Sequence, residues 1–132
     1  MIFSSLLIVV IGLFCITHTT NFRSKQNNTA LSLSADSLII SYLKNEKIAD
    51  SLYINKQLEV SGILKEVNFI NNRKTIILKT QLAPATIICD LQTTTLETLE
   101  KLKQEQHITI EGTCKGFLND VILLNCNIKL NE

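Results

Sequence analysis

Apolar and polar positions alternate with a period of two through most of the second half of the chain. Residues Gln57 to Phe69, "QLEVSGILKEVNF", follow this alternation, and Gly62 interrupts it where a bulge or bend belongs. "TIILKT" (75–80) and "ATIICDL" (85–91) are rich in β-branched residues, and "ITIEGTCKGFLNDVILLNC" (108–126) alternates, turns and alternates again. The pattern predicts five strands, of which the first is the longest.

Other segments have a helical period. "TTTLETLEKLKQEQ" (93–106) places leucines on one stripe behind a threonine cap, which predicts a short amphipathic helix. An apolar pattern that starts at Leu38 predicts a helix before the first strand, capped by Ser34 or Asp36. A weaker helical turn follows at 48–53.

The order of these elements predicts the fold class. Three strands, one helix and two strands is the order of the OB fold, a small Greek-key barrel whose helix lies between strands three and four. A β-sandwich needs about seven strands, and the pattern supplies five. We therefore expect a mainly β chain in which residues 38–132 form a five-stranded OB-fold barrel with a short N-terminal helix.

The start of the chain is a separate hydrophobic segment. No charged side chain occurs in residues 1–22, and the run 2–16 is almost wholly apolar. As a helix the uncharged stretch would reach about 33 Å, against a bilayer core of about 30 Å. No Lys or Arg precedes the run and no small-residue cleavage site follows it. Residues 1–20 are thus predicted to form a hydrophobic helix that anchors the chain in a membrane, with a cleaved signal peptide and a buried core helix as alternatives.

A lipoprotein signal is a further alternative at Cys15, but it requires a small residue before the cysteine and Phe14 stands there. Residues 21–37 are rich in Asn, Ser and Thr and are predicted to form a polar linker. Arg23 and Lys25 follow the apolar run, and such charges weakly favour a cytoplasmic location for that flank.

Composition limits the partners. The chain has 13 Lys and Arg against 12 Asp and Glu, so its net charge of +1 provides no general attraction to nucleic acid. Aromatic residues make up 5% and Trp is absent, which leaves few groups to stack on bases. Neither His18 nor His107 has a recognisable catalytic partner, and no catalytic or metal-binding motif occurs. We expect no enzyme activity and no cofactor.

One small basic cluster lies on the first predicted hairpin, which contributes to the ligand face of OB folds. A ligand face for an oligonucleotide or another anion would combine Phe69 with the basic residues Lys65, Arg73, Lys74 and Lys79. The favoured interpretation is a solvated hairpin edge that charge protects from aggregation.

The cysteines bear on the cellular compartment. By period two, Cys114 and Cys126 share a face of the last hairpin and lie nearly opposite each other, at a spacing that a disulfide accepts. We predict that they are bonded, which would place the barrel in an oxidising compartment, periplasmic or extracellular. A Cys89–Cys126 bond is the competing pairing, because the third and fifth strands of an OB barrel are neighbours. Buried free thiols are the remaining alternative.

The segment from about Leu38 to Ile128 resembles a bacterial tRNA-anti-like OB-fold family of small exported or membrane-attached proteins. The matching stretches are "YINKQLEVSGILKEV", "TIILKT", "TIICDL" and above all the final hairpin, with Gly112, Cys114, Gly116 and the Asp120–Val121 pair. The resemblance implies the OB fold, but neither tRNA binding nor any activity.

Two functions remain. The first is a membrane-tethered extracytoplasmic OB-fold module that binds a protein or small ligand. The alternative is an OB-fold domain that binds single-stranded nucleic acid. Charge balance and the scarcity of aromatic residues favour the first and disfavour nucleic acid as a partner.

Overall fold

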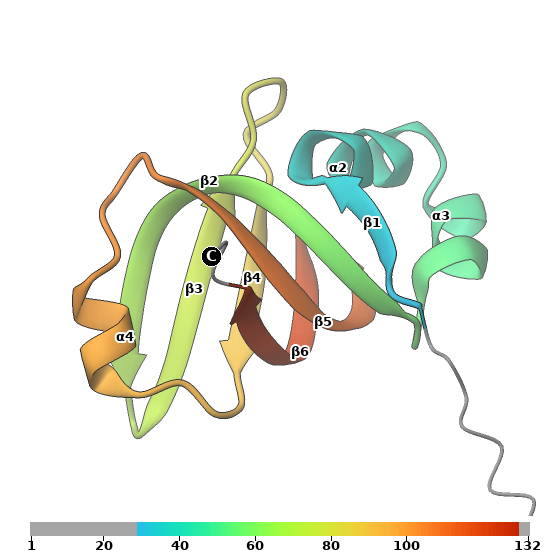
Figure 1. Cartoon of the computed structure of the whole chain (residues 1–132). Helices are drawn as coiled ribbons and strands as arrows, with labels where there is room; N and C mark the ends of the chain where they lie inside the picture. Colours follow the sequence, from blue (N-terminus) through green and yellow to red (C-terminus); the bar gives the residue numbers. More distant parts are fainter. Residues whose placement is uncertain (1–28, 130–132) are drawn as a thin grey trace, which may run out of the picture.

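The five predicted strands close into an OB-fold barrel in the computed structural model, which describes residues 29–129 (Figure 1). Neighbouring strands of the barrel pair antiparallel except β4 (Thr86–Leu91) and β6 (Asp120–Lys129), which pair in parallel. The pairing of β2 with both β3 and β5 completes the circle. The strands are β2 (Gln57–Ile70), β3 (Arg73–Lys79), β4 (Thr86–Leu91), β5 (His107–Leu118) and β6 (Asp120–Lys129).

A strand and two helices precede the barrel, namely β1 (Leu31–Ser34), α2 (Ala35–Lys44) and α3 (Glu46–Tyr53). The predicted cap is confirmed, because the Ser34 side chain accepts a hydrogen bond from the backbone N–H of Ser37 at 3.1 Å. β1 pairs in parallel with residues 58–61 of β2 and continues the edge that β3 leaves uncovered. The polar linker was predicted to reach residue 37, whereas the chain is already a strand at Leu31. Four residues are too few for an alternating pattern to stand out.

The helix between β4 and β5 is present but shorter than predicted. α4 spans Leu96–Glu100, with Thr95 as its N-cap, instead of extending to residue 106. The chain leaves the helical path because β5 must approach β2. Glu105 and Gln106 exchange backbone hydrogen bonds of 2.9 and 2.8 Å with Leu64.

The barrel interior is aliphatic, and the helices join it through aromatic side chains. Tyr42 stacks on Phe117 with ring centroids 5.4 Å apart and lies 6.1 Å from Tyr53. Burial, reinforced by the Cys114 thiol 3.5 Å away, raises the pKa of the Tyr42 hydroxyl far above its ordinary value. The main interior side chains are Leu38, Ile39, Leu58, Val60, Leu64, Ile76, Leu78, Ile87, Cys89, Ile110, Cys114, Val121, Leu123 and Cys126.

The predicted Cys114–Cys126 disulfide is absent, since both residues and Cys89 are buried free thiols. Two bulges shift the β5–β6 register, so that Cys114 pairs with Leu123. The Cys126 sulfur fills the space above Gly112, where an added Cβ would lie only 2.5 Å from it. An oxidising compartment therefore has no support from this bridge.

The competing Cys89–Cys126 pair is also unbonded, although the two thiols are neighbours. Hydrogen bonding to Cys126, followed by burial, raises the pKa of the Cys89 thiol well above its ordinary value. The predicted anchor at 1–20 lies outside the described residues. Within 29–129, no helix is long and apolar enough to cross a membrane.

Candidate functional site

A row of aliphatic side chains crosses the outer face of β3, β4 and β6. Because alternate residues of a strand point to opposite faces, Ile76, Cys89 and Leu123 enter the core while their neighbours point outward. The register aligns these neighbours, pairing Ile77 with Ile88 in β4 and Ile88 with Ile122 in β6. The row and Leu124 line a groove of about 420 Å³.

The rim of the groove is polar and comes from the β2–β3 hairpin. Asn71 and Asn72 form its turn at positive φ angles of 51° and 62°, a conformation that asparagine tolerates well. Asn68 and Asn71 contribute amide groups to the lining. The Arg73 guanidinium donates a hydrogen bond to the Asp90 carboxylate at 2.5 Å, and this bond raises the pKa of Arg73. The groove thus combines an aliphatic floor with a rim that can donate and accept hydrogen bonds.

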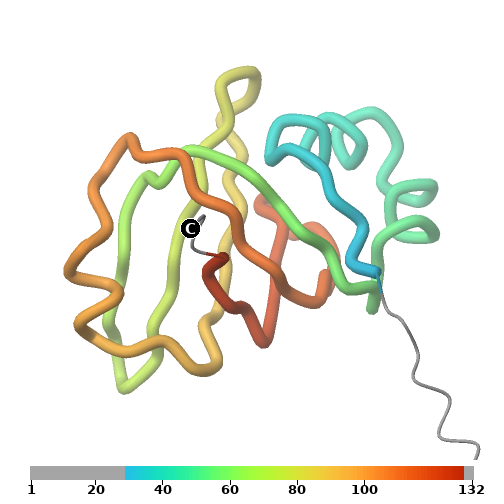
Figure 2. The backbone as a smooth tube through the Cα atoms, in the orientation of Figure 1, coloured from blue at the N-terminus to red at the C-terminus, as the bar shows by residue number. Residues whose placement is uncertain are grey.

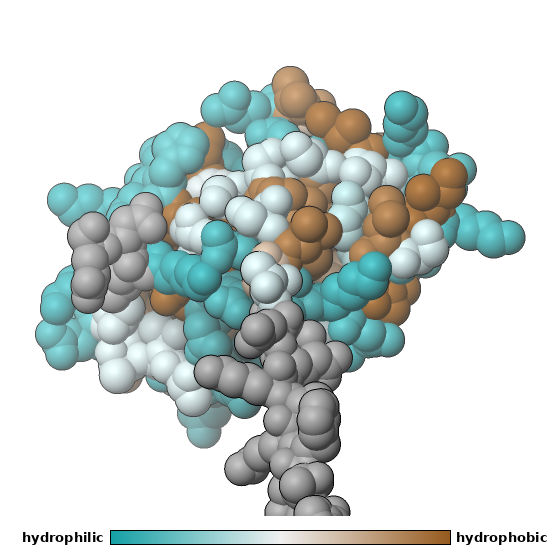
Figure 3. All heavy atoms as spheres, turned by 45° about the vertical axis from the view of Figure 1, so that its right-hand side comes forward, coloured by the Kyte–Doolittle hydropathy of each residue, from teal (hydrophilic) through white to brown (hydrophobic). Residues whose placement is uncertain are grey.

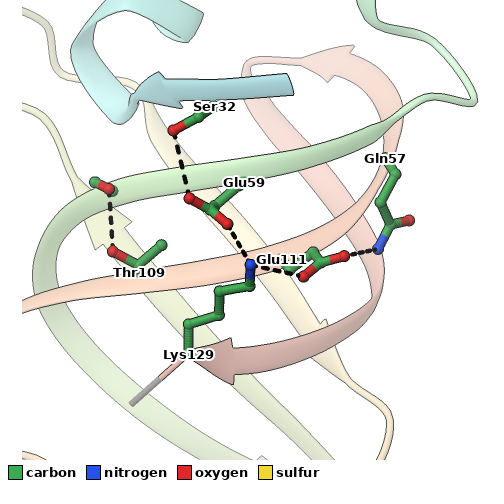
Figure 4. A network of polar contacts seen from close by, with 7 residues as sticks. Ser32, Gln57, Glu59, Thr109, Glu111 and Lys129 are labelled. Carbon is green, nitrogen blue, oxygen red and sulfur yellow. Dashed lines mark hydrogen bonds and ion pairs between the residues drawn. The ribbon is translucent and has the colours of Figure 1, made fainter. Parts of the chain in front are cut away.

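The outer face of β2 and β5 has a different chemistry. Glu59 and Glu111 are direct cross-strand partners, and Lys129 pairs with both carboxylates (Figure 4). Gln57 donates to Glu111 at 3.2 Å, and Ser61 and Thr109 hydrogen-bond at 3.0 Å. The Lys129 hydrogen bond is the main cause that lowers the pKa of Glu59. We call this set the polar face, because its groups satisfy one another.

Comparison with known proteins agrees with this architecture. The family model named tRNA_anti-like matches residues 1–128. The chain belongs to the tRNA_anti-like family. The search of curated proteins found no match for it.

Among solved structures, the tRNA_anti-like chain is similar to a Klebsiella pneumoniae protein provisionally named a nucleic acid-binding lipoprotein. The TM-score is 0.63 at 14% identity, over 76% of this chain and 92% of that one, which shows a shared fold. A provisionally named aspartyl-tRNA synthetase of Leishmania major (TM-score 0.49, 9% identity, 80% of this chain and 22% of that chain) is a weaker likeness. Asparaginyl-tRNA synthetase of Pyrococcus horikoshii is weaker still, at TM-score 0.42 and 14% identity over 58% and 20% of the two chains. The chain spans about a fifth of each synthetase, and neither likeness carries an argument.

The structure separates the five residues of the predicted ligand face. Arg73 lines the groove, but Phe69 and Lys74 are cross-strand partners on the opposite face of the hairpin. Lys74 donates a hydrogen bond to the Thr94 carbonyl. Lys79 forms an ion pair with Glu105 at 2.6 Å, and Lys65 lies exposed at the β2 bulge. These side chains therefore form no common basic surface.

The aliphatic row was missed because the predicted ligand face rested on basic and aromatic side chains, and the row has neither. Its signal is visible in strands where both alternating faces are apolar, as in "TIILK", "TIICD" and "VILLN". One face of such a strand fills the core, and the other is left for a second contact. Among the described residues, no group of three or more His, Cys, Asp or Glu side chains could hold a metal ion.

Proposed function

We propose that this tRNA_anti-like protein is a non-catalytic binding module, held at a membrane with its barrel outside the cytoplasm. Its ligand is an extended polypeptide segment with aliphatic side chains, bound in the groove of β3, β4 and β6. The single observation that carries the ligand class is the aligned row of Ile77, Ile88 and Ile122. Covering an aliphatic surface with a partner removes it from water, which lowers the free energy of the complex.

A polypeptide suits the groove better than a fully apolar ligand. The floor offers contacts to aliphatic side chains, while the amides of Asn68 and Asn71 can hydrogen-bond the peptide backbone. Arg73 and Asp90 add one charge of each sign at the rim. A peptide supplies donors, acceptors and apolar side chains together, so it can satisfy both parts of the lining.

Membrane attachment is supported by the sequence of residues 1–22, which is uncharged and long enough to enter a bilayer. The lipoprotein name of the similar Klebsiella protein agrees with attachment outside the cytoplasm. Alkaline washing of membranes tests this directly. We expect the full-length chain to stay with the membrane and a chain lacking residues 1–20 to be released, whereas release of the full-length chain would contradict the anchor.

Single-stranded nucleic acid is the second candidate ligand, and the name of the Klebsiella protein favours it. The groove offers little to a nucleic acid, because Arg73, the one cation that residues 29–129 contribute to its lining, is paired with Asp90. Tyr42, Tyr53 and Phe117 pack together beneath the helices instead of presenting rings to bases. Phe69 is 56% exposed but belongs to the other face of the hairpin.

A displayed peptide library tests the ligand class. Peptides are selected on the fragment 29–132 and counter-selected on its Ile88→Lys variant, which places a charge in the centre of the row. We expect enrichment of peptides with aliphatic residues, dependent on Ile88. Equal recovery on both proteins, together with tight binding of a fluorescent oligo(dT), would favour the nucleic-acid function instead.

A further inference from the structure

A second apolar surface lies on the helices, at the other side of the molecule from the end that carries α4 (Figures 1 and 3). Ile48 and Leu52 are one helical turn apart on α3 and are 56% and 47% exposed. They line a groove of about 400 Å³ with Ser41, Lys44 and Asn45 of the α2–α3 hairpin. We call this groove and its rim the helical surface.

The helical surface lies close to the point where the N-terminal segment joins the domain. β1 starts at Leu31, which pairs with Leu58, only a few residues after α3 ends at Tyr53. The backbone trace places the start of β1 beside the end of α3 (Figure 2). Seven residue steps separate Phe22, the last residue of the uncharged stretch, from Thr29. Fully extended, these steps span at most about 25 Å.

A short tether changes what a weak apolar contact can do. If residues 1–22 enter a bilayer, the linker keeps the domain at an effective concentration on the order of millimolar near the lipid surface. Lys44 lines the groove and is exposed, and the exposed residues Glu46 and Lys47 follow it closely in the sequence. Lysines beside exposed Ile and Leu side chains are typical of surfaces that rest at the lipid headgroup level.

We propose that the helical surface contacts the phospholipid bilayer to which the chain is tethered, with Ile48 and Leu52 inserted at the headgroup boundary. This contact orients the barrel, and it leaves the groove of β3, β4 and β6 accessible to a peptide. The inference rests on the proposed membrane attachment. Because Glu46 offsets part of the lysine charge, the contact depends on the tether more than on anionic lipid.

The absence of Trp from the chain allows a direct test. A Leu52→Trp variant of the full-length protein carries one fluorescent reporter on the helical surface. The matched control is Leu96→Trp on α4, where the replaced side chain is 54% exposed at the far end of the barrel. Both variants are reconstituted in vesicles of phosphatidylcholine and phosphatidylglycerol, with and without brominated acyl chains as quenchers.

We expect bromine to quench Leu52→Trp several-fold more strongly than Leu96→Trp. Ile48→Trp should repeat the result, and circular dichroism of each variant should match the parent protein. If the protein floats with vesicles but both reporters stay equally unquenched, the helical surface does not face lipid. The proposed membrane attachment through residues 1–22 is then still supported. If the Leu52→Trp emission is blue-shifted without quenching, protein covers the surface, either the chain's own N-terminal segment or a second copy. If the protein does not float, both the tether and this contact are wrong.

Discussion

Both outer faces of the barrel align cross-strand side chains, but on the polar face these side chains bind one another and on the groove face they do not. On the polar face, the like charges of Glu59 and Glu111 would repel each other as cross-strand partners, but Lys129 lies between them. On the groove face, Ile77, Ile88 and Ile122 are aligned just as closely, yet no other part of residues 29–129 covers them completely. A face whose polar groups bind one another is complete in itself, whereas an aligned aliphatic row leaves apolar surface that a partner can cover.

The largest expected effect separates the core from the groove within one strand. Leu123→Ala removes a fully buried side chain beneath the groove, and we expect a loss of about 2–5 kcal/mol in the free energy of unfolding. Leu124→Ala changes the neighbouring half-buried residue on the outer face, with an expected loss of about 1 kcal/mol or less. Urea unfolding of both variants measures the difference. Equal losses would mean that the strand does not alternate as described.

The polar face gives a smaller effect that depends on pH. Lys129→Met should destabilise the protein at neutral pH, because Glu59 and Glu111 then face each other without a cation. The Lys129 hydrogen bond lowers the pKa of Glu59 in the folded state, so its contribution is complete above the unfolded-state pKa. This contribution is lost as the pH falls through the lowered pKa, below about 4.5. The stability difference between parent and variant should therefore shrink on acidification.

Lys101→Met is the matched control for this experiment. Lys101 pairs with Glu97 one helical turn away on α4, and both side chains are largely exposed. We expect almost no change in stability at any pH. If the destabilisation by Lys129→Met stays the same at low pH, its origin is lost packing of the lysine side chain and not the paired carboxylates.

The smallest effect on stability is expected from a lysine added to either outer face. The two variants should differ in ligand binding and not in stability. Ile88→Lys and Ser61→Lys each place a lysine on an outer strand face, the first in the groove and the second beside the polar network.

Fluorescence anisotropy with oligo(dT) at physiological salt should show little binding by the parent protein. Tight binding of oligo(dT) that Arg73→Ala abolishes would show that the groove binds nucleic acid.

The strand order could be predicted because long alternating segments determine which side chains enter a core. The periods of β2 to β6, with the helical segment between β4 and β5, were sufficient for the OB fold. The disulfide failed because its pairing depended on register, and bulges near Gly112 and Gly116 shift register without a clear signal in the sequence. β1 was missed because it has only four residues and its pairing partner is the part of the β2 edge that β3 leaves uncovered.

The candidate site was predictable only in part. The sequence pointed to the β2–β3 hairpin, and Arg73 does line the groove. The other four residues were assigned together because they are near in sequence, whereas strand alternation sends Phe69 and Lys74 to the far side. The alignment of Ile77, Ile88 and Ile122 requires three strands in a known register, so it became visible only in the folded barrel.

Backbone amide NMR of the fragment 29–132, titrated with a peptide from the library selection, tests the central claim most directly. Chemical-shift changes should concentrate on the outward residues of β3, β4 and β6, namely Thr75, Ile77, Ile88, Asp90, Ile122 and Leu124. Ile88→Lys should abolish these changes and Ser61→Lys should leave them intact. Chemical-shift changes centred on Glu59, Thr109 and Glu111 would contradict the account, because the ligand would then bind the polar face and not the groove.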